Sequence, residues 1–306
     1  MGNPATHKEH FKLLYEGLKK VYFDEYGGLP SIIDKMYNVI NDKSFQLEYY
    51  ATGSIPDPVE FAGVVSYQGF SPGYYTRIEP KEYAGGIVIE RRLLDTDKYN
   101  IIKGMAKELG AAAKRKMNKL AHEPFQYFDS TAFSFMTSEE GVALCSNSHT
   151  TKSGTSTASG FDNLSTLGFD ATNLEALRIQ SKGLRNDISE RIDTNFDTII
   201  HPTNLAEDVW TVINSQGKTG DNLNDRSMQY GRWKSIELPL LDDTDTTDWF
   251  IVDSSKMKEH LLWVNSVALE FKDIEDFDTL MRKYRDYFVV GLGFTDWRWC
   301  IGSSVS

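Results

Sequence analysis

The chain has 306 residues, of which 40% are hydrophobic and 25% are charged, and its formal net charge is −11. This acidic balance argues against wholesale wrapping of nucleic acid, because phosphate binding needs a surplus of Lys and Arg on the contacting face. Only Cys145 and Cys300 occur, which argues against a disulfide framework and a cysteine-based zinc site. No stretch approaches the roughly 18 apolar residues of a membrane span, and the start lacks the apolar region of a signal peptide. We therefore expect a protein made and folded in a cytoplasm, with no membrane partner.

The first forty or so residues show helical spacing broken by turn residues. Apolar side chains recur three or four positions apart at Phe11, Leu14, Tyr15, Leu18, Val21 and Tyr22. This spacing predicts a helix over 7–23, which the Gly-Gly-Leu-Pro stretch at 27–30 ends, and a second short helix over 32–40. Such short pieces have too little sequence to bury their own apolar faces, so the segment is interpreted as an arm.

From residue 45 to residue 92 the pattern changes to strand-like alternation interrupted by turn residues. Strands are predicted at 74–78 and 86–90, and they suggest a long projecting hairpin. On a monomer this hairpin would expose the aromatic residues Tyr67, Phe70, Tyr74, Tyr75 and Tyr83. Exposed apolar patches of this kind usually bind a partner.

The clearest predicted element is a long helix over 99–122, which Pro124 is expected to end. Its apolar stripe includes Ile102, Ala106 and Leu109. Between residues 91 and 123, nine Lys or Arg stand against four Asp or Glu, so positive charge is concentrated around this helix. A solvated face balanced by neighbouring carboxylates is the favoured interpretation, ahead of a surface facing DNA or a scaffold.

The Ser, Thr and Gly run at 147–160 is interpreted as a surface loop, because it cannot bury enough apolar area to order itself. Beyond it we predict helices over 173–192 and 204–213, and strands at 196–201, 234–238, 249–252, 267–271 and 284–301. In the last strand, Trp297 and Trp299 fall on one face and Arg298 on the other.

A search for chemistry finds no phosphate-binding loop and no metal-ligand spacing. Cys145 and His149 lie four residues apart and could form the nucleophile and base of a hydrolase, but a buried thiol beside a loop histidine is favoured. The aspartates at 242, 243, 245 and 248 could ligate calcium, yet they lack the spacing of the twelve-residue calcium loop, and a solvated turn is favoured. No catalytic residue, cofactor or metal is predicted.

The order of four segments along the chain is informative. The segments are Ile87–Asp95, which precedes the long helix, Asp197–Leu205, Asp248–Asp253 and Tyr287–Trp299. Together with the arm, hairpin and long helix, this order resembles the major capsid proteins of tailed bacteriophages with the Hong Kong 97-type fold, an α+β fold. The first segment is similar to the end of the family's extended loop where it enters the spine helix. The resemblance implies an N-terminal arm over 1–44, an extended-loop hairpin over 45–90, a peripheral domain of 91–165 and 266–306, and an axial domain over 166–265.

The resemblance implies a structural, non-enzymatic function as a virion capsid subunit that assembles in the host bacterial cytoplasm. Copies would form hexamers and pentamers and close into an icosahedral head around double-stranded DNA, which would lie non-specifically against the inner face. Further implied partners are a portal, decoration proteins and a separate scaffolding protein, the last because the chain starts close to the arm. An encapsulin-like nanocompartment shell is the alternative within the same fold, and a cytoplasmic hydrolase using Cys145 and His149 is the distant one.

Two groups of residues are predicted to carry this function. The candidates for contacts between subunits are Phe11, Tyr15, Phe70, Tyr74, Tyr75, Arg77 and Tyr83. Trp297 and Trp299 are expected to lock the last strand onto the layer of the long helix.

Overall fold

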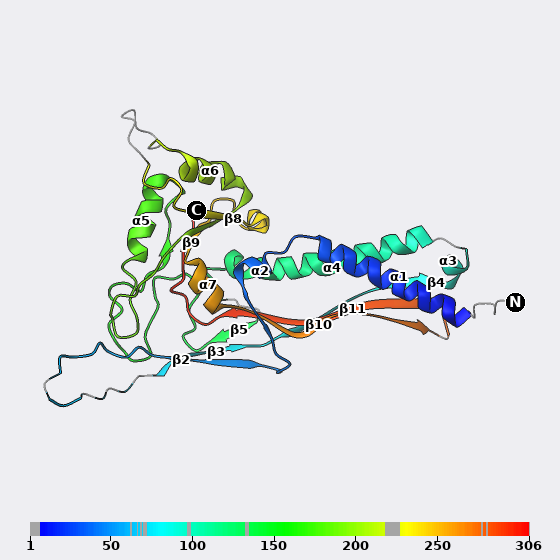
Figure 1. The fold of residues 1–306 in the computed structure, drawn as a ribbon, viewed down its shortest axis with the longest axis horizontal. Coiled ribbons are helices and arrows are strands. Elements are labelled where there is room, and N and C mark those ends of the chain that lie inside the picture. The colour runs from blue at the N-terminus through cyan, green and yellow to red at the C-terminus, as the bar shows by residue number, and fades with distance from the viewer. Residues whose placement is uncertain are drawn as a thin grey trace.

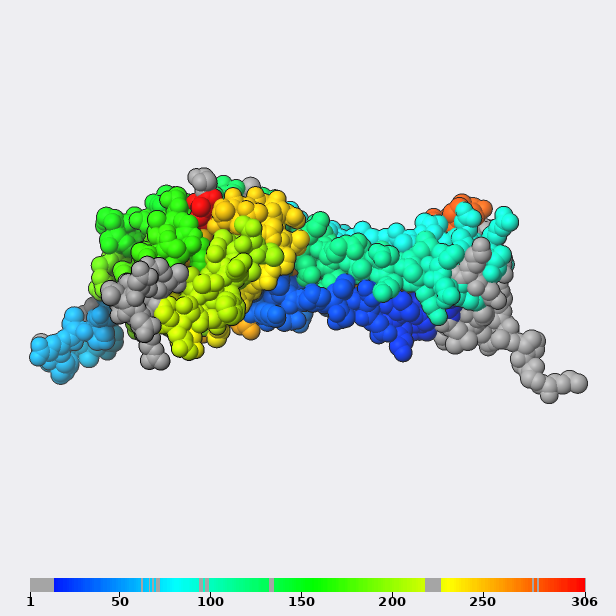
Figure 2. Space-filling model, turned by 90° about the horizontal axis from the view of Figure 1, so that it is seen from above, coloured from blue at the N-terminus to red at the C-terminus, as the bar shows by residue number. Residues whose placement is uncertain are grey.

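The chain forms an elongated molecule, with one sheet and its helices at one end and a long helix lying over a long sheet at the other (Figures 1 and 2). The computed structural model describes residues 7–61, 63–65, 67, 69, 72–96, 99–131, 135–217, 227–276, 278–279 and 281–305, and among these it describes no side chains for 7–13 and 94–95. Helices and strands are both well represented, as predicted for an α+β fold.

The long sheet forms the floor of the elongated half (Figure 1). Its strands, in spatial order, are β1 (Asn38–Asn41), β10 (Leu261–Asp276), β11 (Met281–Phe294) and β4 (Lys81–Glu90). The β10–β11 and β11–β4 pairs are antiparallel, whereas β1 joins β10 in parallel. Strands from the first and the last third of the sequence therefore share one sheet, and the arm region contributes one of its edge strands.

Helix α4 (Tyr99–Gln126) lies over this sheet and confirms the predicted long helix. Its buried positions include Ile102, Ala106 and Leu109, as the apolar stripe predicted. The helix continues past Pro124 to Gln126, so the predicted end at residue 122 is four residues short. The short helix α3 (Arg91–Asp95) comes between β4 and α4.

Helix α1 (His7–Gly28) packs along α4 (Figures 1 and 2). The two backbones come so close at Gly110 that a Cβ there would lie 2.7 Å from the Tyr22 carbonyl oxygen. Leu18 and Tyr22 are buried, and the Tyr22 hydroxyl donates to Asp286 at 3.0 Å. Burial, with Asp286 beside it, raises the pKa of Tyr22 well above its ordinary value. The expectation that the arm cannot bury its own apolar face is therefore wrong for α1, which docks on its own subunit.

A second, three-stranded sheet carries the projecting hairpin. It consists of β2 (Leu47–Thr52), β3 (Pro72–Ile78) and β5 (Met136–Ser138), with β3 in the middle and antiparallel to both neighbours. Both strands predicted in the hairpin region exist, but they do not pair with each other, since β4 joins the long sheet through β11. The hairpin is made by β2 and β3, and the described residues of the 53–71 connection between them project from the body (Figure 1).

The third sheet lies at the other end of the molecule and has five strands. Their order is β6 (Leu164–Ser165), β12 (Cys300–Ser303), β9 (Trp249–Val252), β7 (Thr198–His201) and β8 (Lys234–Glu237). All residues of β7, β9 and β12 are buried, which explains their continuous apolar runs. The helical segments of this half and its connections are α2 (Ile33–Met36), α5 (Ala171–Ser181), η1 (Thr203–Leu205), α6 (Ala206–Asn214), η2 (Pro239–Asp243) and α7 (Ser254–His260).

The strand predicted over 284–301 is interrupted by a turn between β11 and β12. The Asp296 carboxylate accepts hydrogen bonds from the backbone N–H groups of Trp297 and Arg298, at 2.7 and 3.1 Å. The indole N–H of Trp299 donates to the Asp296 carbonyl oxygen at 2.7 Å. Because the backbone groups of the turn are satisfied locally, the chain leaves the long sheet and enters the five-stranded one.

Candidate assembly surface

The connection between β2 and β3 exposes large apolar side chains far from the body of the molecule. Tyr67 is 92% exposed, Phe61 71%, and Phe45, just before β2, 85%. Val59, Val64 and Val65 are exposed in the same connection. In Figure 2 this segment projects beyond the five-stranded sheet and its helices. A contiguous exposed apolar segment is unusual for a soluble monomer and indicates a contact surface.

A second exposed apolar group lies on and near α6. Val209, Val212 and Ile213 face the core, whereas Trp210 points off that stripe and is 66% exposed. Met228 and Tyr230 are exposed close by, since the Gly231 N–H donates to the Ile213 carbonyl oxygen. A tryptophan outside the apolar stripe of a helix is the sequence signal that could have identified this surface.

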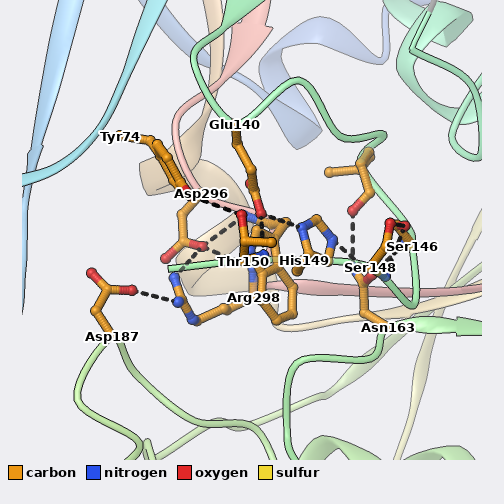
Figure 3. Close-up of polar contacts among 12 residues, drawn as sticks. Tyr74, Glu140, Ser146, Ser148, His149, Thr150, Asn163, Asp187, Asp296 and Arg298 are labelled. Carbon is orange, nitrogen blue, oxygen red and sulfur yellow. Dashed lines mark hydrogen bonds and ion pairs between the residues drawn. The ribbon is translucent and has the colours of Figure 1, made fainter. Parts of the chain in front are cut away.

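The base of the hairpin borders a pocket of about 470 Å³. Its walls come from β2, β3, β5 and the turn after β11. The Tyr74 hydroxyl shares a hydrogen bond of 2.8 Å with the Thr150 hydroxyl, and the Glu139 carboxylate accepts from the backbone N–H of Tyr75 at 3.0 Å. The first contact joins the hairpin to the 147–160 loop (Figure 3), and the second joins it to the residue that follows β5.

Arg298 lines the pocket and contacts several residues at once (Figure 3). We call Arg298 with its partners Arg185, Asp187 and Asp296 the hub. Its guanidinium donates to Asp187 at 2.7 Å and to Asp296 at 3.1 Å, and its Nε donates to the Arg185 carbonyl oxygen at 2.8 Å. The guanidinium also lies over the Trp297 ring, 4.8 Å from the centroid. Although burial opposes the effect, Asp296 and Asp187 raise the pKa of Arg298, and Arg298 with His260 holds the pKa of Asp296 below its ordinary value. The hub joins the region after α5 to the turn before β12.

His149 is buried beside Trp297, the residue that Arg298 also contacts. Its Nδ1 lies 3.1 Å from a Glu140 carboxylate oxygen, its Nε2 lies 3.1 Å from the Asn163 side-chain oxygen, and its ring stacks on Trp297 at 4.0 Å (Figure 3). Thr151 in the same loop is also buried. The expected surface loop at 147–160 is therefore held in part by buried polar contacts, which a prediction from apolar content does not consider.

The comparisons with known proteins decide the family. A profile described as "Phage capsid protein" matches residues 73–302, which include α4, the hub at Arg298 and most of the five-stranded sheet. The chain belongs to this phage capsid protein family. A comparison with curated proteins gave no match.

Solved structures share the fold of this capsid protein at low sequence identity. The capsid of a native GTA particle matches with a TM-score of 0.56 and 11% identity, covering 91% of both chains. A virus-like particle from Pyrococcus furiosus matches with a TM-score of 0.52 and 9% identity, covering 95% of this chain and 99% of that one. The procapsid of bacteriophage JBD30 matches with a TM-score of 0.50 and 12% identity, covering 97% of this chain and 75% of that one. The predicted Hong Kong 97-type capsid fold is confirmed.

The subunit-contact candidates of the capsid protein are held by its own chain where their side chains are described. The Tyr15 hydroxyl donates to the Phe271 carbonyl oxygen at 2.7 Å, and Arg77 pairs with Glu79 at 2.7 Å. Tyr75 stacks on Tyr50. Tyr83 stacks on Phe288. Tyr74 forms the hydrogen bond with Thr150 described above. All five side chains are half-buried.

Phe70 and the side chain of Phe11 lie outside the described residues. Among the described residues of the hairpin region, the largely exposed aromatic ones are Phe45, Tyr50, Phe61 and Tyr67, none of which is among the predicted subunit contacts. Their role in contacts between subunits, like that of the predicted set, remains a prediction.

The geometry of Cys145 and His149 does not support the hydrolase hypothesis. Both ring nitrogens of His149 have other partners, and the Cys145 sulfur lies 3.9 Å from that of Cys300. A nucleophile needs its base within hydrogen-bond reach. Across the described part of the chain, no group of three or more His, Cys, Asp or Glu side chains is placed to hold a metal ion. Nor does any described helix have the length and apolarity to cross a membrane.

Proposed function

We propose that this capsid protein self-assembles as hexamers and pentamers into the icosahedral head that encloses phage double-stranded DNA. The observation that carries the proposal is the pair of exposed apolar surfaces, one on the 53–71 connection and one at Trp210, on a chain of the phage capsid family. Repeated contacts between copies in a closed shell would bury both surfaces.

Charge on α4 supports a role for this helix in contacting an anionic partner on the inner face. Lys103, Lys107, Arg115 and Lys119 are exposed on the helix, with Glu108 as an exposed acidic residue among them. Lys107 also forms a 3.4 Å ion pair with Glu25 of α1. Such a face can bind DNA or an acidic scaffold without sequence preference, while the net charge of −11 of the whole chain limits adhesion to the cargo.

We also propose the family's division into arm (1–44), extended loop (45–90), peripheral domain (91–165 and 266–306) and axial domain (166–265). The separate long and five-stranded sheets support two main units. Strand β12 links them, because it follows β11 of the long sheet and pairs with β9 of the other. On this division, the Trp210 surface belongs to the axial domain, where copies would meet around an axis.

Further partners are proposed from the family alone. They are a separate scaffolding protein, a portal, decoration proteins and packaged DNA, with assembly in the host bacterial cytoplasm. A head that takes up its genome through one vertex needs a portal there, and a shell of hexamers and pentamers needs control of its curvature, which a scaffold would supply.

Electron microscopy and size-exclusion chromatography of the expressed chain test the proposal. We expect closed particles or hexamers and pentamers from the wild type. Trp210→Glu should give folded subunits that do not assemble, because the charge would be buried in the contact. Thr211→Glu is the matched control, since it adds the same charge at the next exposed position of α6 without removing an apolar side chain.

The outcomes separate the alternatives. A wild-type chain that stays monomeric at high concentration would contradict the proposal. Nuclease-protected DNA inside particles from infected cells would support the phage head, and a packaged enzyme in its place would favour the nanocompartment shell.

A further inference from the structure

The two cysteines of the chain meet in the core although 155 positions separate them. Their sulfur atoms lie 3.9 Å apart, and both side chains are buried. Cys300 belongs to β12, the second strand of the five-stranded sheet, whereas Cys145 lies in the loop that follows β5. A contact between these sulfurs therefore joins the sheet to a loop outside it.

The backbones around the two sulfurs are held in register by one side chain. The Asn163 amide nitrogen donates to the carbonyl oxygens of Leu144 and Cys300, at 2.9 and 3.0 Å. The Cys145 N–H donates to the Phe128 carbonyl oxygen at 2.8 Å. Gly302 completes the close approach, because a Cβ there would lie 2.9 Å from the Cys145 sulfur.

The separation is within reach of a covalent bond. A disulfide needs sulfurs about 2.05 Å apart, so the pair must close by roughly 2 Å. Rotation about χ1 from one staggered position to the next moves a sulfur by more than that distance. A change of side-chain rotamer can therefore supply the movement that the sulfur atoms need.

We propose that Cys145 and Cys300 form a reversible disulfide that fastens β12 to the 139–163 loop. The co-reactant is a low-molecular-weight disulfide such as oxidised glutathione. The Cys145 thiolate attacks one of its sulfurs, which forms a mixed disulfide and releases one thiol. The Cys300 thiolate then attacks the Cys145 sulfur and releases the second thiol, so two protein thiols are oxidised while one small disulfide is reduced to two thiols.

Access decides when this reaction takes place. On its outer edge β12 is paired with β6 through two register pairs, Gly302 with Leu164 and Ser303 with Ser165. Local opening of this short pair admits the oxidant, so oxidation is slow compared with that of exposed thiols. If the chain acts as a virion subunit, as proposed above, the bond forms after the particle leaves the reducing cytoplasm; the timing rests on that function, and the bond itself does not.

Wild-type protein, as the assembled particle or the purified subunit, is incubated with oxidised glutathione or with dithiothreitol. Non-reducing peptide mapping should then find a Cys145–Cys300 crosslink within one chain in the oxidised sample only. The thiol titre of the denatured protein should fall by two per chain. Closing a loop of this length should raise the melting temperature by about 5 to 10 °C, and dithiothreitol should reverse the rise.

Cys145→Ala and Cys300→Ala are the controls, and each should lose the glutathione-dependent shift. A mixed glutathione disulfide that persists on either cysteine, a crosslink between two chains, or two thiols that stay free after prolonged oxidation would each overturn the proposal. Because the wild type carries the test, a variant that fails to fold leaves the result intact. Particle formation is scored separately by electron microscopy, so a failure of the proposed assembly is distinguishable from a failure of the bond.

Discussion

The 53–71 connection and the turn at 295–299 use the same kinds of residue for opposite purposes. In the turn, Trp297 and Trp299 are buried, and the Trp299 ring meets Phe125 of α4 edge to face at 6.2 Å. In the connection, Phe61 and Tyr67 meet solvent. Aromatic content alone therefore does not distinguish a core segment from a contact surface. The two segments differ in whether their rings find backbone and ring partners within the same chain.

Trp299→Ala should break this contrast most strongly. The side chain is fully buried and its N–H is bonded to Asp296, so truncation should leave a cavity and cost roughly 3 to 5 kcal/mol of unfolding free energy. Urea denaturation of the subunit measures the loss, and assembly should fail with it. Trp210→Ala, the same change at an exposed position, should cost less than about 0.5 kcal/mol. Equal losses in the two variants would remove the distinction between the regions.

Arg298→Met should have the next largest effect, because it leaves Asp187 and Asp296 without their shared partner in a largely buried site. We expect a loss of roughly 2 to 4 kcal/mol, below that of a fully buried pair since some solvent reaches the side chains. Thermal unfolding at neutral pH measures it. Arg191→Met, at an exposed arginine of the neighbouring segment, is the control and should unfold like the wild type. An unchanged melting temperature for Arg298→Met would show that the contacts of Arg298 with Asp187 and Asp296 do not stabilise the fold.

Asp248→Asn should stabilise the protein in a pH-dependent way. Burial, reinforced by Asp245 and Asp129, raises the pKa of Asp248 to about 6, above its ordinary value of 3.8. The folded state binds the proton of the Asp248 carboxyl more tightly than the unfolded state does. This proton therefore contributes to the free energy of unfolding below pH 4, and the contribution is lost as the pH rises through 6. The asparagine oxygen can still accept from the Val305 N–H. At pH 8 the variant should gain roughly 1 to 2 kcal/mol, discounted for partial exposure.

Melting temperatures at pH 4 and pH 8 check this prediction. The gain of Asp248→Asn should shrink at pH 4, where the wild-type carboxyl is largely protonated. Asp243→Asn, at an exposed aspartate, is the control and should show no such difference. An equal gain at both values would contradict the assigned cause.

The double variant Phe61→Ser with Tyr67→Ser should change the stability of the fold least. It tests the exposed region of the comparison, the 53–71 connection. Both side chains are exposed, so the unfolding free energy should change by less than about 0.5 kcal/mol, whereas particle yield should fall. Thermal unfolding and electron microscopy of the same preparation separate the two effects. Glu60→Ser, a polar change in the same connection, should leave both unchanged. A normal particle yield from the double variant would exclude this segment from the contact between subunits.

Local patterns in the sequence predicted the elements whose periodicity is local. The stripe of α4 follows from spacings of three and four residues, and the buried strand β9 follows from its apolar run. Pairing across long sequence separations was not predictable in this way. The alternation over 284–301 continues through a turn that Asp296 holds, and nothing local shows that β3 pairs with β2 and β5 while β4 pairs with β11.

The site was less predictable than the fold for the same reason. The contact of Arg298 with Asp187 spans 111 positions, and the contact of Tyr74 with Thr150 spans 76. The predicted tyrosines of the hairpin were chosen by residue type, which does not distinguish a ring stacked on its own chain, such as Tyr83, from an exposed one, such as Tyr67. Trp210 was detectable in principle, because it lies off the apolar stripe of α6.

Strand β12 also constrains the moment at which the subunit can become competent. Its four residues are inserted between β6 and β9, and they are synthesised more than a hundred positions after β6. Until the ribosome has released residue 303, β9 lacks one of its two strand neighbours and the thiol of Cys145 lacks its counterpart. A nascent chain that ends before β12 therefore lacks one inner strand of the five-stranded sheet.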